Sequence, residues 1–211
     1  TFTISSGLVN SQTLVVTGTA TFALSDVGIQ TATAQTVSLA NGTGLASNYS
    51  LSAGQTATAT IAKATLTISS ITAQNKVYDA TNTATISAYT SNVIGSDQIT
   101  FSSTPTFASV NAANGITVTA SNIAISGNDA GNYTLATTSR TTTANITPAT
   151  VTLSATKVYD GSTSLTGFVT VTGVAGQTLN YTSATSSDAN VGTSSKYIKT
   201  ITLANNGSVL A

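Results

Sequence analysis

The sequence contains one long segment twice, and this repetition constrains the fold more than any other feature. Residues 61–79 read IAKATLTISSITAQNKVYD, and residues 146–160 read ITPATVTLSATKVYD. Both segments end in a Lys-Val-Tyr-Asp box, at positions 76–79 and 157–160. Self-similarity at a long fixed period, here about 80–85 residues, is the signature of an array of repeated structural units. The sequence therefore predicts a chain of repeats and not one continuous domain.

The repeat divides the sequence into three copies. The middle copy, residues 64–148, contains the whole pattern. The first copy, residues 1–63, lacks the opening strand, and the third copy, residues 149–211, lacks the closing strand. We therefore expect the chain to be a window cut from a longer array. No flexible linker separates the copies, and Pro148 stiffens the second junction, so we expect an elongated rod.

Alternating apolar and polar residues predict β-strands along the chain. In the middle copy this period of two recurs at residues 65–69, 98–102 and 116–119, between clusters of Gly, Asn and Asp. Thr, which favours strands, is abundant, whereas the helix-favouring residues Glu and Met are absent. We therefore expect an all-β or mostly β fold. We also expect a tight turn at Asn114-Gly115, because both residues tolerate positive φ.

Charge is scarce and balanced, with six basic residues, six acidic residues and a net charge of zero. Without a basic cluster, the chain lacks the electrostatic footprint of a nucleic-acid-binding protein. No stretch approaches the roughly 20 apolar residues of a membrane span, so we expect no membrane insertion in this segment. Cys is absent, and Thr, Ser, Asn and Gly are abundant. This composition is typical of an extracellular protein at the bacterial cell surface.

The residue types argue against catalysis and against a bound metal or cofactor. His, Cys and Glu are absent, so the common general bases and the favoured ligands of zinc are missing. The six acids are Asp residues spread among the copies, which suits neither paired-carboxylate hydrolysis nor a clustered calcium site. A Ser187–Lys196 dyad and one calcium site per copy stay open as alternatives. We predict no catalytic, cofactor-binding or metal-binding residues.

Two short motifs recur at equivalent places in the copies. A Tyr-Asp pair ends each box, and an Asn-Tyr pair recurs near the end of the first and middle copies. The Tyr-Asp pair could be an aromatic platform and carboxylate for a sugar. Its recurrence favours a structural role, in which Asp accepts backbone N–H groups in a turn and Tyr packs beside it. The residues of this structural repeat motif are Lys76, Tyr78, Asp79, Lys157, Tyr159, Asp160, Gly161, Asn48, Tyr49, Asn132 and Tyr133.

Three motifs together suggest a known family: KVYDG at residues 157–161, NVGT at residues 190–193 and GNYTL at residues 131–135. In this order they resemble the YDG and MBG ("mostly β-grasp") repeats, which form tandem arrays in large bacterial filamentous-haemagglutinin-like surface adhesins. The resemblance covers the chain as two and a half copies and implies small, mostly β domains related to the β-grasp. The middle copy departs from the pattern, because it has Ala80 where the third copy has Gly161.

The resemblance implies a structural function and no enzymatic activity. We expect a stalk or spacer segment of a secreted adhesin, or of an extracellular filament such as those of a biofilm matrix, that projects a distal binding region. The expected partners are neighbouring repeats of the same chain. One alternative is a module that binds polysaccharide or host-cell glycans. Another is a subunit of an extracellular fibre, in which neighbouring chains complete each other by strand addition.

Overall fold

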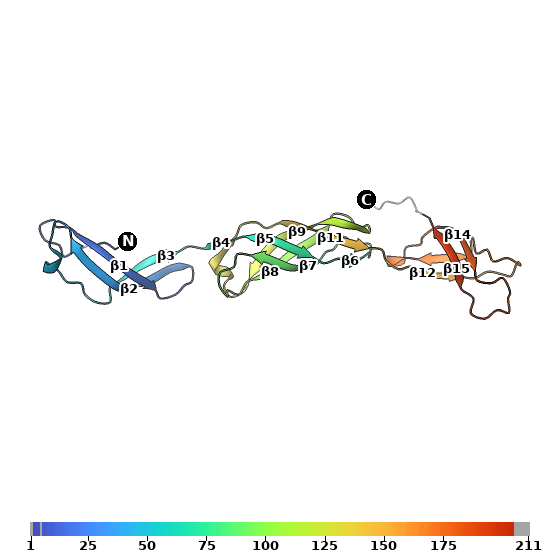
Figure 1. Ribbon diagram of the computed structural model, residues 1–211, viewed down its shortest axis with the longest axis horizontal. Helices are drawn as coiled ribbons and strands as arrows, with labels where there is room; N and C mark the ends of the chain where they lie inside the picture. Colours follow the sequence, from blue (N-terminus) through green and yellow to red (C-terminus); the bar gives the residue numbers. More distant parts are fainter. Residues whose placement is uncertain (1, 5, 205–211) are drawn as a thin grey trace. The chain divides into compact units, whose positions relative to one another are not determined.

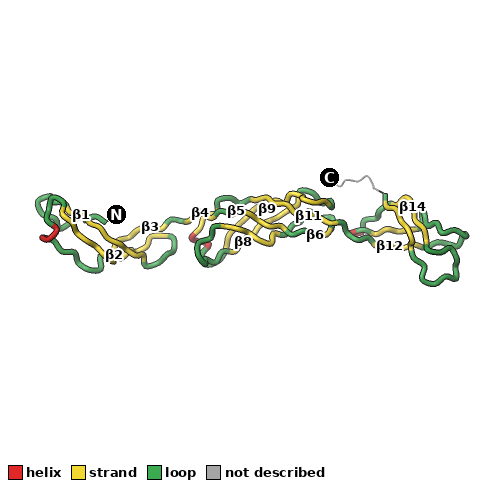
Figure 2. Tube along the Cα trace, viewed as in Figure 1, coloured by secondary structure: helices red, strands yellow, loops and turns green. Residues whose placement is uncertain are grey.

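The structure is a computed structural model that describes residues 2–4 and 6–204 (Figure 1). Within these residues, β-strands are joined by loops and three short 3₁₀ turns, and no α-helix occurs (Figure 2). The predicted all-β fold is therefore confirmed. The strands are β1 (Leu14–Phe22), β2 (Gly28–Asn41), β3 (Thr56–Ile61), β4 (Ala64–Leu66), β5 (Ile68–Ala73), β6 (Lys76–Val77), β7 (Ile86–Ser91), β8 (Thr100–Phe107), β9 (Ala113–Ser126), β10 (Tyr133–Leu135), β11 (Arg140–Thr147), β12 (Thr152–Ala155), β13 (Val169–Thr172), β14 (Tyr181–Ser186) and β15 (Ile198–Leu203). The 3₁₀ turns are η1 (Ala46–Asn48), η2 (Ala130–Asn132) and η3 (Val174–Gly176).

The chain divides into two compact units, each of which combines part of the middle copy with a neighbouring copy. The segments of the first unit are Thr1–Thr67, Asn92–Phe101 and Ala124–Ala136. Those of the second unit are Ile68–Ser91, Ser102–Ile123 and Thr137–Ala211.

The first unit contains an antiparallel sheet with the strand order β1-β2-β3. Leu14 lies opposite Asn41 at one end of the first pairing, and Gly28 lies opposite Ile61 in the second. Among the described residues of the first copy no apolar side chain is buried, and Ile29 is 77% exposed. This sheet is therefore held by its backbone ladder with little help from an apolar core.

The first unit also contains a short parallel pair, formed by β4 and β10. Tyr133 lies opposite Ala64, and Leu135 lies opposite Leu66. Leu66 is fully buried, and Tyr133 is 3% exposed. This pairing places the opening strand of the middle copy beside the Asn-Tyr motif that lies near the end of the same copy.

The second unit contains a sheet with the order β6-β11-β9-β8, and β5 of the separate β5-β7 pair packs against β11. β11 runs antiparallel to β9 and parallel to β6. Phe107, Val118, Ala144 and Ile146 form the buried cluster of this region. Ala144 and Ile146 lie two residues apart on β11 and therefore face the same side of the sheet.

The prediction of a tight turn at Asn114-Gly115 is wrong. Both residues lie inside β9, where the register with β11 shifts between Ala144 and Ile146. Gly115 has a φ of 66°, and its N–H donates to Asn145 Oδ1 at 2.8 Å. The positive φ is used for a β-bulge, which inserts a residue into one strand, and the chain does not reverse there.

The remainder of the second unit comes from the third copy and repeats the pairing of the middle copy. β12 pairs with β13, and β14 pairs with β15, both antiparallel. The bridge between Thr83 and Thr106 in the middle copy corresponds to the bridge between Ser164 and Thr185 in the third copy. The buried apolar residues of this part are Leu165, Val171 and Ala184.

Candidate functional site

The lysine of the first box is enclosed by its own turn, in an arrangement that we call the lysine cage. Lys76 Nζ donates to Asp79 Oδ1 at 2.8 Å and to the main-chain oxygen of Thr81 at 2.7 Å. The same Asp79 oxygen accepts the N–H of Thr81 at 2.9 Å. The lysine ammonium also lies 5.5 Å from the centre of the Phe107 ring, within cation–π range. The aspartate therefore has the turn role that the sequence predicts, and it also binds the lysine.

The second box forms the same cage. Lys157 Nζ lies 2.6 Å from Asp160 Oδ1 and donates to the main-chain oxygen of Ser164 at 2.7 Å. Asp160 Oδ1 accepts the N–H of Ser162 at 2.9 Å, as Asp79 does from Thr81. The two box turns thus make equivalent hydrogen bonds around the lysine, as expected for repeated units.

Hydrogen bonds lower the pKa of both box aspartates. The Lys76 ammonium, followed by the backbone N–H of Thr81, lowers the pKa of Asp79 to about 2. Lys157, followed by the N–H of Ser162, lowers the pKa of Asp160. At neutral pH each box is therefore a charged turn whose polar groups satisfy one another, which leaves little unpaired charge for a ligand.

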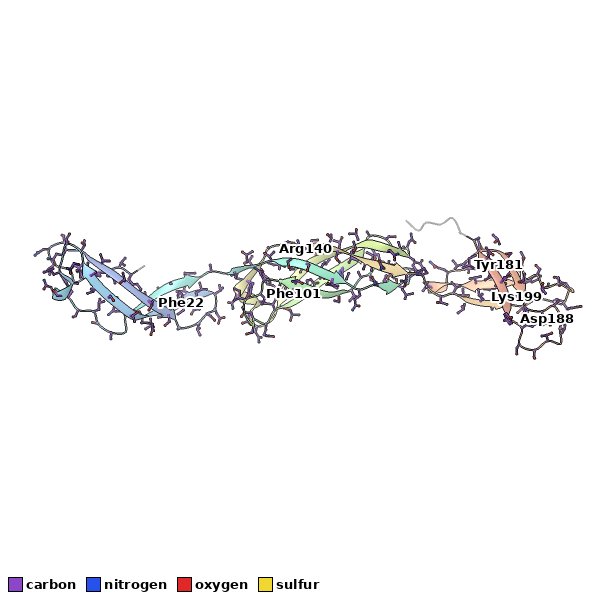
Figure 3. The ribbon with its side chains drawn as sticks, viewed as in Figure 1. Phe22, Phe101, Arg140, Tyr181, Asp188 and Lys199 are labelled. Carbon is purple, nitrogen blue, oxygen red and sulfur yellow. The ribbon has the colours of Figure 1, made fainter. Side chains whose placement is uncertain are left out.

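Asp188 forms a third turn of this kind on the loop after β14 (Figure 3). Its Oδ1 accepts the N–H of Asn190 at 2.9 Å, and its Oδ2 accepts the hydroxyl of Thr193. The Asn190 hydrogen bond, followed by that of Thr193, lowers the pKa of Asp188. The NVGT motif that begins at Asn190 therefore belongs to a structural turn.

The two cages differ in the aromatic residue beside the lysine. The N–H of Phe107 donates to Asn82 at 2.7 Å, and the N–H of Ser186 donates to Thr163 at 2.8 Å. Ser186 therefore holds the position of Phe107 in the third copy. There Lys157 lies 5.8 Å from the ring of Phe168, which is 48% exposed, whereas Phe107 is 2% exposed. The lysine cage of the third copy is therefore open on the side that Phe107 closes in the middle copy.

The tyrosines of the Asn-Tyr motif hold a turn in two copies. The Tyr133 hydroxyl donates to Asp97 Oδ2 at 2.6 Å and accepts the N–H of Ile94 at 3.0 Å. In the first copy, the Tyr49 hydroxyl donates to Gln12 Oε1 at 2.6 Å and accepts the N–H of Val9 at 3.4 Å. The hydrogen bond to Asp97 raises the pKa of Tyr133. We call this arrangement the tyrosine latch.

Inside the first unit, the asparagine of the second motif contacts the first copy. Asn132 Oδ1 accepts the N–H of Val27 at 3.0 Å, and its Nδ2 donates to Asp26 Oδ1 at 3.0 Å. Asn48, in contrast, is exposed and closes η1 through its backbone. The two asparagines of the motif therefore have different partners.

Inside the second unit, the tyrosines of the two boxes have different surroundings. Tyr78 packs against the buried cluster, and its hydroxyl accepts from Gln177 Nε2 at 3.1 Å. Tyr159 is 60% exposed. Gln177 ends the turn at residues 174–177, which corresponds to the turns at residues 9–12 and 94–97. Gln12, Asp97 and Gln177 therefore occupy the same last position of the turn in the three copies. A side chain that can bind a tyrosine hydroxyl recurs there, but the recurrence can be recognised in the sequence only after the three turns are aligned.

The third copy contains an open groove of about 720 Å³ beside its box. Lys157, Val158 and Tyr159 line one side, and Lys196, Tyr197 and Ile198 belong to the strand β15 and the loop before it. Asp160 and Asp188 balance the two lysines. The groove is therefore apolar in part and nearly neutral.

The sites left open by the sequence are not assembled in the described residues. Ser187 Oγ accepts the N–H of Tyr197 at 3.3 Å, and no hydrogen bond joins Ser187 to Lys196 in the described part of the chain. No group of three or more acidic, His or Cys side chains that could hold a metal ion occurs between residues 6 and 204. No helix in the described ranges is long and apolar enough to cross a membrane.

Comparison with known proteins identifies one domain. A family model described as the YDG domain matches residues 62–141, which are nearly the whole middle copy. No curated protein and no solved structure matches the chain significantly.

Proposed function

Because residues 62–141 form a YDG domain, we propose that this chain is a stalk or spacer segment of a secreted bacterial adhesin or extracellular filament. In this proposal the three copies are β-grasp-like repeats arranged as an elongated rod, and their function is to project a distal binding region from the cell surface.

The direct connection between consecutive copies is the observation that carries this proposal. β3 ends at Ile61 and β4 begins at Ala64, so two residues separate the strands of neighbouring copies. Pro148 follows β11 directly, and its ring restricts the backbone before the next strand. Short, restricted connections favour a stiff array over domains that move independently.

The charges of the chain support the same function. The boxes pair their own lysines and aspartates within single turns, and the net charge of the chain is zero. A spacer with few unpaired charges should keep its dimensions when the ionic strength changes, because there is little repulsion to screen.

Small-angle X-ray scattering of the 211-residue chain tests the proposal. A compact protein of this length has a radius of gyration of about 17 Å. Three repeats of about 35 Å each in line would give a rod with a radius of gyration of about 30 Å. A value near 30 Å that is unchanged between low and high salt is expected. A value near 17 Å would contradict the spacer.

The glycan-binding alternative has one observation in its favour. Tyr159 and Tyr197 are 60% and 64% exposed, and both line the groove of the third copy beside Asp160. Exposed aromatic rings beside a carboxylate can bind sugars. A glycan array with the whole chain, compared with a chain carrying Tyr197→Ala, tests this alternative, and the absence of any binding favours the spacer.

A further inference from the structure

The connection between the first and middle copies lies inside the first unit, between two strand pairings. β3 ends at Ile61, which lies opposite Gly28 of β2. β4 begins at Ala64, which lies opposite Tyr133 of β10. The covalent link is therefore residues 62–63, and both are exposed. A link of two residues limits the distance between the two pairings, but its backbone dihedral angles can still rotate.

A second connection runs beside this link and is made by an asparagine side chain. The residue before Gly28 is Val27, whose N–H donates to Asn132 Oδ1 at 3.0 Å. Asn132 directly precedes Tyr133 and also donates from Nδ2 to Asp26 Oδ1 at 3.0 Å. The bonded residues are 105 and 106 positions apart in the chain. The two strand pairings that border the link are therefore also joined to each other through Asn132.

The groups at this second connection match a carboxamide. The carbonyl oxygen of Asn132 accepts the N–H of Val27, while its NH₂ group donates to the carboxylate of Asp26. An aspartate in place of Asn132 would have no donor and would bring two negative charges together. The backbone of Asn132 is itself held, because its N–H donates to the main-chain oxygen of Asp129 at 3.0 Å and the next residue, Tyr133, is 3% exposed.

We propose that Asn132 braces the junction between the first and middle copies, so that the covalent link and the asparagine hold the joint at two points. Two points of attachment oppose bending, whereas a single link permits it. This role deepens the proposed spacer function and rests on it, because stiffness matters to a chain that has to keep a distance. The two residues of the Asn-Tyr motif then have different tasks: Tyr133 holds a turn of its own copy, and Asn132 binds the copy before it.

The loop that Asn132 binds has an equivalent at the next junction, inside the second unit. Residues 26–27 directly precede the 14-residue strand β2, and residues 111–112 directly precede the 14-residue strand β9. Residues 111–112 line a cavity of about 300 Å³ together with residues 173–174 and Gln177 of the third copy. At both junctions, the loop before the long strand therefore lies beside the copy that follows.

Pairs of spin labels on the two sides of the first junction measure its bending directly. The chain has no Cys, so Ser38→Cys in the first copy and Ser126→Cys in the middle copy give two unique labelling sites, and both serines are exposed. Pulsed electron spin resonance should give a narrow distribution of distances between the labels. Asn132→Ala should broaden this distribution, because only the covalent link remains. Hydrogen exchange at the Val27 N–H should accelerate about tenfold, the factor that corresponds to one lost hydrogen bond.

Three further variants make the test specific to the asparagine. Asn132→Asp keeps an acceptor for Val27 but loses the donor, and it should also broaden the distribution. Adding Asp26→Asn to Asn132→Asp exchanges the carboxylate and the carboxamide, which restores the pair and should restore the narrow distribution. Asn48→Ala is the matched control, because Asn48 is the exposed asparagine of the same motif in the first copy. It should change neither the distances nor the exchange at Val27.

Hydrogen exchange at the Val118 amide, in the buried cluster of the middle copy, shows that each variant is folded. The brace is overturned if the distribution is already broad without a change at Asn132, if Asn132→Ala leaves it narrow, or if the exchanged pair fails to restore it. Failure of the spacer function is a separate result. A compact radius of gyration would refute the spacer whatever the labels show, whereas a narrow distribution in Asn132→Ala would refute only the brace.

Discussion

Ala80 and Gly161 occupy the same backbone position in two copies, directly after the box aspartate, with φ values of 63° and 77°. This left-handed conformation is unfavourable for a residue with a Cβ atom by about 1–2 kcal/mol and is adopted freely by glycine. The middle copy therefore tolerates a strained residue at a turn where the third copy has glycine.

Exchanging these two residues should have opposite effects on stability. Ala80→Gly should stabilise the middle copy by up to about 1 kcal/mol, because the relief of strain exceeds the added freedom of the unfolded chain. Gly161→Ala should destabilise the third copy by about 1 kcal/mol, because an added Cβ meets open space and only the conformation is unfavourable. Hydrogen exchange at the Val118 amide reports on the stability of the middle copy, and exchange at the Val171 amide reports on that of the third copy. If both substitutions stabilise, or both destabilise, their copies, backbone strain at this position is not the cause.

The lysine cage should give the middle copy a dependence on acidic pH. The pKa of Asp79 is about 2 in the folded state, below its ordinary value of 3.8. Its contribution to stability is therefore complete above pH 4 and is lost as the pH falls from about 4 to about 2. Lys76→Met should return the pKa of Asp79 towards its ordinary value, as measured by NMR titration of its carboxyl carbon.

The matched control for this titration is Lys63→Met, since Lys63 belongs to neither cage. If Lys76→Met and Lys63→Met leave the titration of Asp79 equally unchanged, the lysine is not the cause of the lowered pKa.

The tyrosine latch should resist alkaline pH. The hydrogen bond to Asp97 raises the pKa of Tyr133, so the stabilisation is fully present below the ordinary tyrosine pKa of 10 and is lost as the pH rises through the raised value. In a titration of tyrosine absorbance, Tyr133→Phe should remove a component that ionises above the ordinary tyrosine pKa of 10. Asp97→Asn should lower the pKa of Tyr133, because a neutral acceptor does not oppose the phenolate charge. Loss of an earlier component in Tyr133→Phe would argue against the latch.

Ile68 and Leu153 stand at the same point of the repeated segment but should respond differently to truncation. Ile68 is 1% exposed, whereas Leu153 is 38% exposed at the groove. Ile68→Ala should destabilise the middle copy by about 2–5 kcal/mol through a cavity in its core. Leu153→Ala should cost less than about 1 kcal/mol, because the surface around it is already open to water. Denaturant unfolding followed by hydrogen exchange in each copy measures both, and similar losses would mean that the third copy has a closed core.

The fold class and the turn role of the box aspartate were predictable from the sequence, because both depend on local patterns. Alternating apolar and polar residues predict the strands, and an aspartate that can accept the N–H of the residue two positions later predicts the turn. The β-bulge at Gly115 was not predictable, because the same positive φ serves a hairpin turn and a bulge. Only the register between β9 and β11 distinguishes them.

The surroundings of the recurring tyrosines also depend on tertiary structure. Identical boxes give a half-buried Tyr78 and an exposed Tyr159, because β11 borders the first box and no described strand borders the second. That Ser186 of the third copy stands where the middle copy has Phe107 becomes clear only when the hydrogen bonds of the two copies are compared. Repetition in a sequence therefore predicts equivalent backbones more reliably than equivalent surfaces.

The sheet of the first copy has a mechanical consequence. Its three strands are held by backbone hydrogen bonds, and none of the described apolar side chains in this copy is buried. Under tension, a segment without a packed interior yields at lower force than its better-packed neighbours. In the proposed spacer, the first copy would therefore be the part that lengthens first under load.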